Sequence, residues 1–144
     1  MKNSIYILII LLIVAACSTT KTSVPTSEKT KAITHNDTIK IVNEELEYEV
    51  IIIEPGFDFW LQSTALPRNY YSQSYLENKN YNYVLEWNNR VRQPQIYPTN
   101  LYEMTINYEP TINYGYEVNY LIYNYMVYFQ NKYNQQLYGR VPPR

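Results

Sequence analysis

The sequence predicts a small α+β domain in which one or two short strands pack with two longer helices. Residues 46–53, LEYEVIII, alternate in polarity and then become β-branched, which is typical of a strand. Residues 72–92 and 116–138 contain no Gly or Pro and repeat apolar residues at helical spacing. A chain of 144 residues fits one domain, and we expect the folded part to span residues 39–144.

The expected strand at residues 46–53 is followed by a turn and a short helix. Pro55-Gly56 ends the strand, because this dipeptide favours a turn. Residues 58–66 then favour a helix of about two turns, with Pro67 after its end. Asp58 is a plausible N-cap, since its carboxylate can accept a hydrogen bond from a backbone N–H of the first turn.

The first long helix is expected over residues 72–92. Ser72 is a candidate N-cap, and Pro94 follows shortly after the helix ends. Apolar and aromatic residues recur at spacings of three and four, so they share one helix face. That face consists of Leu76, Asn80, Tyr83, Val84, Trp87 and Val91. Arg90 and Arg92 suit the negative end of the helix dipole, or alternatively form a polar recognition patch.

A short internal repeat follows the first long helix. Thr-Ile-Asn-Tyr occurs at residues 105–108 and again at 111–114, and Glu109-Pro110 interrupts the two copies. A period of six residues keeps both copies on the same face of an extended strand. We therefore expect a strand here that ends in a proline turn. The duplication is too short to indicate a repeat protein.

The second long helix is expected over residues 116–138, although this stretch is ambiguous. The even-numbered positions from Tyr114 to Ile122 alternate with smaller or polar residues, as in a strand. A helical stripe also fits and continues without a break to Tyr133. Length favours the helix, because strands rarely exceed about ten residues and no Gly or Pro interrupts the stretch.

Tyrosine is the most over-represented residue type, with 18 tyrosines against three phenylalanines. A buried phenol without a hydrogen-bond partner costs about 1–3 kcal/mol, so we expect many tyrosines to lie at the surface. Aromatic and amide groups together can contact glycans or proteins. The expected binding residues are Trp60, Trp87, Asn88, Tyr116, Tyr120 and Tyr123. The alternative is compositional, since AT-rich codons favour tyrosine and its ring can cover a small core while its hydroxyl stays wet.

Residues 1–16 have the features of a signal peptide. Lys2 precedes an apolar run from Ile5 to Ala16, which has the length of a signal-peptide hydrophobic region and is short for a bilayer span. The run ends in Val14-Ala15-Ala16-Cys17, which resembles the bacterial lipobox. This resemblance implies cleavage before Cys17, diacylation of its sulfur, and an acylated N-terminus that carries palmitate-type chains. The alternatives are a transmembrane anchor or a simple secretory signal.

Residues 17–38 are expected to form a flexible linker between the lipid and the domain. They are rich in Ser, Thr and Lys and hold few large apolar side chains. His35, the only histidine, lies in this linker, where a catalytic imidazole would have no positioned partner. If lipid modifies the only cysteine, no thiol is left for a disulfide or a metal. We expect Cys17 to anchor the protein in the bacterial cell envelope, at the outer membrane or the periplasmic face.

The residue types offer little support for catalysis. Glu54, Asp58 and Glu86 are carboxylates near aromatic residues, a combination used in glycoside hydrolysis, but Asp58 can also be a cap and Glu54 a solvated strand end. One histidine and one cysteine predict neither a Ser-His-Asp triad nor a metal site. No glycine-rich phosphate loop occurs, and we expect no cofactor. A formal net charge of −1 argues against nucleic acid as a partner.

Three motifs together resemble a family of small bacterial lipoproteins of unknown function. They are EPGFDFWL from Glu54, YYSQSYLENKNYNYVLEWNNR from Tyr70 and INYGYEVNYLIYNYMVYF from Ile112. The resemblance implies a single domain behind a lipobox, and it implies no activity or site residue. We expect a non-enzymatic envelope lipoprotein with a structural or protein-binding role. The alternative is a module that binds glycan or cell-wall polymer through exposed Trp and Tyr, or less plausibly a carbohydrate-active enzyme.

Overall fold

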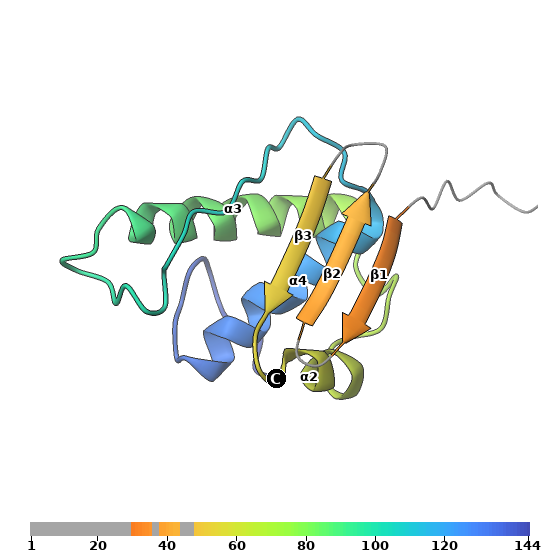
Figure 1. Ribbon diagram of the computed structural model, residues 1–144, viewed down its shortest axis with the longest axis horizontal. Helices are drawn as coiled ribbons and strands as arrows, with labels where there is room; N and C mark the ends of the chain where they lie inside the picture. The colour runs from red at the N-terminus through yellow and green to blue at the C-terminus, as the bar shows by residue number, and fades with distance from the viewer. Residues whose placement is uncertain (1–29, 36–37, 44–47) are drawn as a thin grey trace, which may run out of the picture.

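The computed structural model describes residues 30–35, 38–43 and 48–144, and these residues form an α+β domain (Figure 1). The elements in chain order are β1 (Thr30–His35), β2 (Thr38–Asn43), β3 (Tyr48–Ile53), α2 (Phe57–Ser63), α3 (Gln73–Val91) and α4 (Gly115–Lys132). The predicted fold class is therefore confirmed. The expected signal peptide, Cys17, and residues 18–29 and 36–37 of the expected linker lie outside the described residues.

Three antiparallel strands form one sheet in the order β1-β2-β3, which is more than the one or two strands expected. In register, Ile39 of β2 lies opposite Ile52 of β3. β1 falls within residues 17–38, and β2 begins one residue before the expected domain start at 39. The Ser-, Thr- and Lys-rich composition of residues 17–38 suggested a linker, but the Thr, Ile and Val residues of β1 and β2 are also good strand formers. The folded part thus begins before residue 39.

The strand expected at residues 46–53 is confirmed as β3, and it buries only one face. Ile52 is 8 % exposed and belongs to the core, whereas Ile51 and Ile53 are 52 % and 72 % exposed. Lys40 of β2 forms an ion pair with Glu49 of β3. The three consecutive isoleucines therefore follow the period-two alternation of a half-buried strand rather than a strand buried on both faces.

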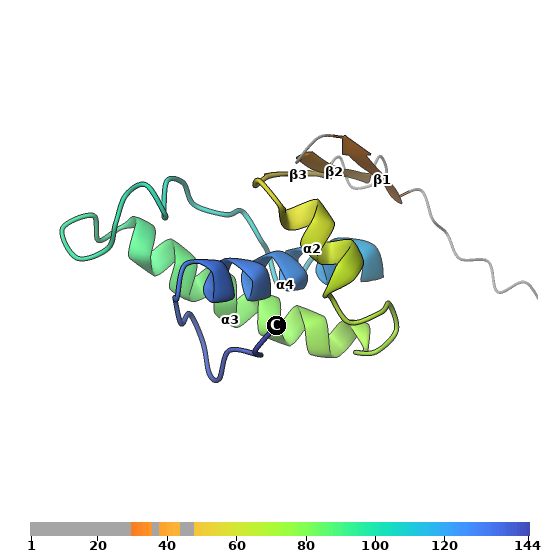
Figure 2. The ribbon, with the colours of Figure 1, turned by 90° about the horizontal axis from the view of Figure 1, so that it is seen from below.

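The short helix α2 begins one residue earlier than expected, and Asp58 is not its N-cap. Gly56 occupies the cap position with a φ of 84°, a left-handed conformation that suits glycine, and Asp58 lies in the first turn. Phe57, 1 % exposed, anchors α2 in the core against the ring of Tyr128, with the ring centroids 5.4 Å apart. Figure 2 shows α2 between the sheet and the longer helices.

Helix α3 agrees closely with its prediction. The Ser72 side chain accepts a hydrogen bond from the backbone N–H of Tyr75 at 3.3 Å, which confirms the expected N-cap. The expected core face is buried except for Val91, which is half-buried. Its buried residues are Leu76, Asn80, Tyr83, Val84 and Trp87. The 3.6-residue period therefore located the core side of this helix correctly.

Helix α4 is confirmed as a helix, but it ends at Lys132 rather than residue 138. Asn134 has a φ of 51°, a left-handed conformation, and the backbone N–H of Gln135 bonds to the carbonyl of Gln130 at 2.9 Å. The Gln130 side chain then accepts the backbone N–H of Leu137 at 2.7 Å. The first bond satisfies the backbone carbonyl of Gln130 near the end of the helix, and the second holds the chain that turns away, as in other helix C-terminal motifs.

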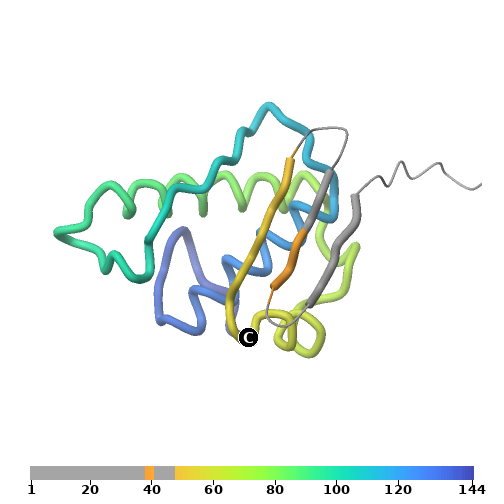
Figure 3. Tube along the Cα trace, viewed as in Figure 1, coloured from red at the N-terminus to blue at the C-terminus, as the bar shows by residue number. Residues whose placement is uncertain are grey.

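The strand expected near residues 105–108 is absent, since residues 101–113 contain no strand. Side chains of α3 bond to this backbone instead. The indole N–H of Trp87 donates to the Met104 carbonyl at 2.9 Å. The Asn88 amide donates to the Ile106 carbonyl at 2.9 Å and accepts its N–H at 2.8 Å. This connection carries the chain back along α3, so α3 and α4 run in the same direction (Figure 3).

Candidate functional site

An open cavity of about 550 Å³ lies where the sheet, α2 and α4 meet the α2–α3 loop. Its size falls within the range of small-molecule sites in proteins. The lining residues are Ile39, Asp58, Leu61, Gln62, Ala65, Pro67, Arg68 and Tyr120. The walls combine four aliphatic residues and the ring of Tyr120 with three polar or charged side chains. This concave surface is a candidate site.

Asp58 and Gln62 present their polar groups from one side of α2. They are four residues apart, so they lie one above the other on the same helix face. One carboxylate oxygen of Asp58, Oδ1, accepts the backbone N–H of Phe59 at 2.6 Å. The other oxygen and the Gln62 amide make no hydrogen bond to the described residues. Both groups are therefore free to bond a ligand.

Arg68 forms the opposite rim, and Glu117 of α4 fixes its position. Its Nε donates to Glu117 Oε2 at 2.8 Å and its Nη2 donates to Oε1 at 2.5 Å. The guanidinium carbon also lies 4.6 Å from the ring centroid of Tyr120, as in a cation–π contact. The hydrogen bond to Glu117 raises the pKa of Arg68, so the guanidinium stays protonated. Only Nη1 remains without a bond to the described residues.

Two tyrosines of α4 hold the α2–α3 loop in place. Tyr120 donates its hydroxyl proton to the Leu66 carbonyl at 2.8 Å. The backbone N–H of Asn69, which has a φ of 68°, donates to the Tyr116 hydroxyl at 2.6 Å. Burial raises the pKa of Tyr120, so its hydroxyl stays protonated as a donor. The cavity wall is thus tied to the core helix on both sides of Arg68.

The six residues expected to form an exposed binding surface do not form one. Trp87, Tyr120 and Tyr123 are only 6 %, 5 % and 1 % exposed, so their expected exposure is wrong. Asn88 is half-buried and holds residue 106 with both ends of its amide. Trp87, Asn88 and Tyr120 can be buried because their polar atoms form hydrogen bonds with backbone groups of distant segments. The Tyr123 hydroxyl is the exception, since it has no hydrogen-bond partner among the described residues.

Trp60 and Tyr116 are the two half-buried aromatic members of that set. Trp60 packs on the core rings of Phe57 and Tyr128, with centroids 6.3 Å and 5.6 Å away. The ring of Tyr116 stacks on that of Tyr120 at 6.1 Å. Tyr120 lines the cavity and Tyr116 holds the loop beside it, so both tyrosines lie next to the cavity.

The three carboxylates considered for catalysis lie in different environments. Glu54 is bound by the Lys132 ammonium at 2.5 Å and by the hydroxyl of Tyr133 at 2.9 Å. Glu86 is bound by Arg90 at 2.7 Å. Asp58 alone lines the cavity. No facing pair of carboxylates is therefore available in the cavity for the acid and base roles of glycoside hydrolysis. In residues 30–35, 38–43 and 48–144, no group of three metal-binding side chains occurs.

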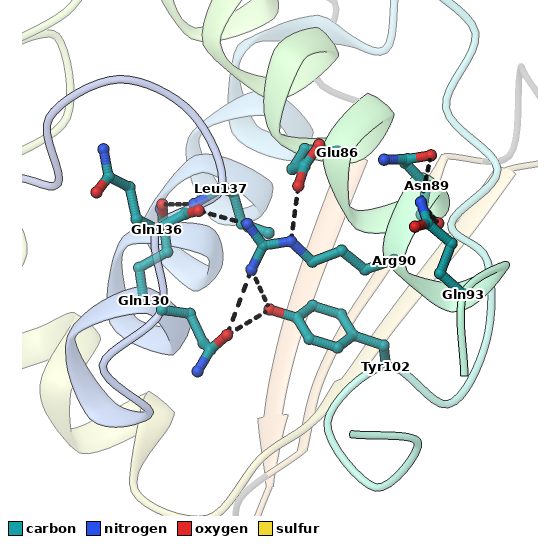
Figure 4. A network of polar contacts seen from close by, with 9 residues as sticks. Glu86, Asn89, Arg90, Gln93, Tyr102, Gln130, Gln136 and Leu137 are labelled. Atoms are coloured by element: carbon teal, nitrogen blue, oxygen red, sulfur yellow. Dashed lines mark hydrogen bonds and ion pairs between the residues drawn. The ribbon is translucent and has the colours of Figure 1, made fainter. Parts of the chain in front are cut away.

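A second polar cluster surrounds Arg90 at the end of α3, and Figure 4 shows it between Glu86 and Tyr102. Arg90 is 9 % exposed, and its Nη1 and Nη2 donate to Tyr102 and to the Gln136 carbonyl at 2.8 and 2.5 Å. Burial lowers the pKa of Arg90, but the bonds to Glu86 and Tyr102 outweigh it and raise the pKa above its ordinary value. This arginine therefore has a structural role, joining α3 to the C-terminal segment.

Sequence reasoning missed Gln62, Arg68 and Glu117. The spacing of four between Asp58 and Gln62 was a usable signal for a shared helix face. The pairing of Arg68 with Glu117 spans 49 positions and depends on how the loop meets α4. No local pattern encodes that contact.

Comparison with known proteins assigns the chain to a family. A family model described as "Family of unknown function (DUF6146)" matches residues 5–141. The chain belongs to DUF6146. No curated protein matches it, and no solved structure does either. The expected resemblance to a family of unknown function is thus confirmed at the family level.

The DUF6146 model covers both ends of the cavity-forming region, from the start of the sheet to α4. Within the part of the chain that the structure describes, no helix is long and apolar enough to span a bilayer.

Proposed function

We propose that this DUF6146 protein is a membrane-anchored envelope lipoprotein with a non-enzymatic structural or partner-binding role. The observation that supports the anchor is the run from Ile5 to Ala16 followed directly by Cys17. Signal peptidase would remove residues 1–16, and the acyl chains on Cys17 would hold the protein to the bilayer. Each buried CH₂ contributes about 0.8 kcal/mol, so two or three chains give firm attachment.

Mass spectrometry of the protein purified from its native envelope tests this anchor. The expected mass lacks residues 1–16 and includes acyl chains on residue 17. The Cys17→Ser variant should fail to gain lipid and should leave the detergent-soluble membrane fraction. Detection of residue 1, or of an unmodified thiol at position 17, would contradict the proposal.

The solvent face of α3 supports a role in partner binding. Seven of its positions share one face, and none before the last carries a charge: Ser74, Asn78, Tyr81, Asn82, Leu85, Asn89 and Arg92. Tyr81 and Leu85 are 43 % and 55 % exposed and lie four residues apart. Depletion of charge and enrichment in aromatic residues are typical of protein interfaces.

Cross-linking at this face tests the partner-binding role. A photo-reactive residue at position 85 of the lipid-anchored protein should form one discrete cross-linked product. An excess of an unlabelled copy that carries Leu85→Asp should not suppress this product, because that copy should not bind the partner. Position 96 supplies the matched control, because Ile96 is a comparably exposed aliphatic residue at 67 % on the α3–α4 connection. Equal products from positions 85 and 96 would indicate random proximity and would contradict a role for the α3 face.

Binding to a glycan or cell-wall polymer is the second candidate, and the cavity beside α2 supports it. Of the expected stacking residues, which were Trp60, Trp87 and the exposed tyrosines, Trp87 and Tyr123 are too buried to stack on a sugar. The cavity instead offers polar side chains around apolar walls. A carbohydrate-active enzyme has less support, since Asp58 is the only carboxylate among the lining residues.

A further inference from the structure

We propose that the cavity between α2, β2 and the α2–α3 loop binds a neutral sugar residue, with Asp58, Gln62 and Arg68 as its hydrogen-bonding groups. This inference deepens the second candidate function and rests on it. It does not depend on the lipid anchor or on the α3 face. It differs from aromatic stacking, because the ring of Tyr120 is already covered by the Arg68 guanidinium at 4.6 Å.

The charge in the cavity argues against an anionic ligand. Glu117 neutralises Arg68 through two hydrogen bonds, whereas no described cation pairs with Asp58. An anion would therefore meet the Asp58 carboxylate as a like charge. A cation would bring its charge towards the free Nη1 donors of Arg68. A neutral ligand avoids both costs.

The free polar atoms match what sugar hydroxyls need. Asp58 Oδ2 can accept hydrogen bonds, Arg68 Nη1 can donate them, and the Gln62 amide can do both. A hydroxyl group is also both donor and acceptor, so adjacent hydroxyls can bridge such planar groups. A site built to bond hydroxyls discriminates strongly against ligands that lack them, because its own polar atoms would be left unpaired.

The apolar walls suit the C–H faces of a sugar ring. Ile39, Leu61, Ala65 and Pro67 line the cavity around the polar groups. A sugar presents hydroxyls at its edge and C–H groups on its faces, so it can satisfy both kinds of lining at once. Burial of the apolar surface contributes about 25 cal/mol per Å² removed from water.

The cavity is also largely pre-formed. The loop that carries Arg68 is held by Tyr120 at Leu66 and by Tyr116 at Asn69. Arg68 itself is held by Glu117. A ligand would therefore not have to order this loop, and pre-organised sites lose less affinity to conformational entropy.

Ligand-observed saturation-transfer NMR tests the proposal on the full-length chain. The protein is purified with its native N-terminus in lauryldimethylamine oxide, since sugar-headed detergents would compete for the site. The probes are glucose, galactose, mannose, N-acetylglucosamine and their disaccharides. We expect at least one probe to bind, with its ring protons saturated from the protein.

Three variants place the binding in the cavity. Asp58→Asn removes a charge-assisted hydrogen bond and should weaken binding about tenfold. Gln62→Ala should weaken it several-fold, and Ala65→Leu should abolish it by filling the cavity while leaving the polar groups in place. Glu103→Gln and Gln95→Ala are matched controls, because both residues are exposed and neither makes a hydrogen bond to the described residues. A melting curve confirms that each variant is folded.

Three results would overturn the proposal. The first is saturation of none of the probes. The second is binding that Asp58→Asn and Ala65→Leu leave unchanged, which would place the sugar elsewhere on the chain and retain only the wider idea of a glycan-binding protein. The third is competition by simple amines at the same concentrations, which would identify a cation site. Loss of the anchor in the mass-spectrometric test affects none of these outcomes.

Discussion

Replacing Arg90 by Met should destabilise the fold more than any other substitution that removes a single charged side chain. The side chain is 10 % exposed and bonds to Glu86, Tyr102, Gln135 and the Gln136 carbonyl. Met keeps the aliphatic stem but removes every donor. Glu86 is 28 % exposed and regains some water, whereas the partly buried carbonyl of Gln136 loses its charged partner.

We expect a loss of about 3 kcal/mol in the free energy of unfolding, at the lower end of the range for breaking a buried ion pair. Tyr102 keeps its bond to Gln135 at 2.9 Å, which limits the cost. Urea unfolding followed by circular dichroism measures the loss. Arg92→Met is the matched control, because Arg92 is exposed and bonds only to the Asn88 carbonyl, and it should change stability by less than about 0.5 kcal/mol.

A double-mutant cycle with Glu86→Gln separates the ion pair from the rest of the network. The coupling between the two substitutions should be about 1–2 kcal/mol, since the residues are in direct contact. A loss below about 1 kcal/mol for Arg90→Met would refute the reasoning. So would a coupling near zero, because both would mean that Arg90 is solvated in solution.

Three further substitutions and one titration follow from the same geometry. Gly56→Ala should cost about 2 kcal/mol by urea unfolding, because the φ of 84° strains an L residue and the new Cβ would lie 3.2 Å from the Tyr128 hydroxyl. Tyr128→Phe should lower the free energy of unfolding by about 1 kcal/mol, because it loses the 2.7 Å hydrogen bond to the Pro55 carbonyl. Tyr123→Phe should be neutral or stabilising, because the buried Tyr123 hydroxyl has no hydrogen-bond partner among the described residues. Equal losses of stability from the two substitutions would contradict this reasoning. Burial raises the pKa of Tyr108 from 10 to about 12, so as the pH rises the unfolded chain loses the Tyr108 hydroxyl proton before the folded chain does. The free energy of unfolding should therefore fall between pH 10 and 12. Urea unfolding at a series of pH values measures this, and a free energy that does not change over that range would count against it.

The helices were predictable from sequence because their signals are local. In α3 the cap at Ser72 and the spacing of the core face are set within the helix itself. The end of α4 was misplaced, because the chain turns at the left-handed Asn134 and is held there by the Leu137 N–H, which donates to the Gln130 side chain. The false strand near residues 105–108 had strand-like composition, but its backbone partners come from the side chains of Trp87 and Asn88.

The burial of the tyrosines could not be predicted, because their hydroxyl partners are distant in sequence. Tyr48 donates to the Asn107 carbonyl at 3.2 Å, across 59 positions. Tyr108 donates to the Asn119 side chain at 2.7 Å, and Asn119 is bonded in turn by Asn80. Composition gives the number of tyrosines but not the hydrogen-bond acceptor of each tyrosine hydroxyl. The pairing of Arg68 with Glu117 at the cavity rim could not be predicted for the same reason, since the two residues are 49 positions apart.

Tyr120 and Tyr128 tether Leu66 and Pro55 to one helix, across 54 and 73 positions of the chain. In a chain with a single cysteine, these phenol–carbonyl bonds take the place that covalent cross-links hold in many small extracytoplasmic domains. They form without an oxidant and are insensitive to reductant. The architecture should therefore assemble identically whatever thiol-oxidising machinery its compartment contains, and dithiothreitol should leave its melting curve unmoved.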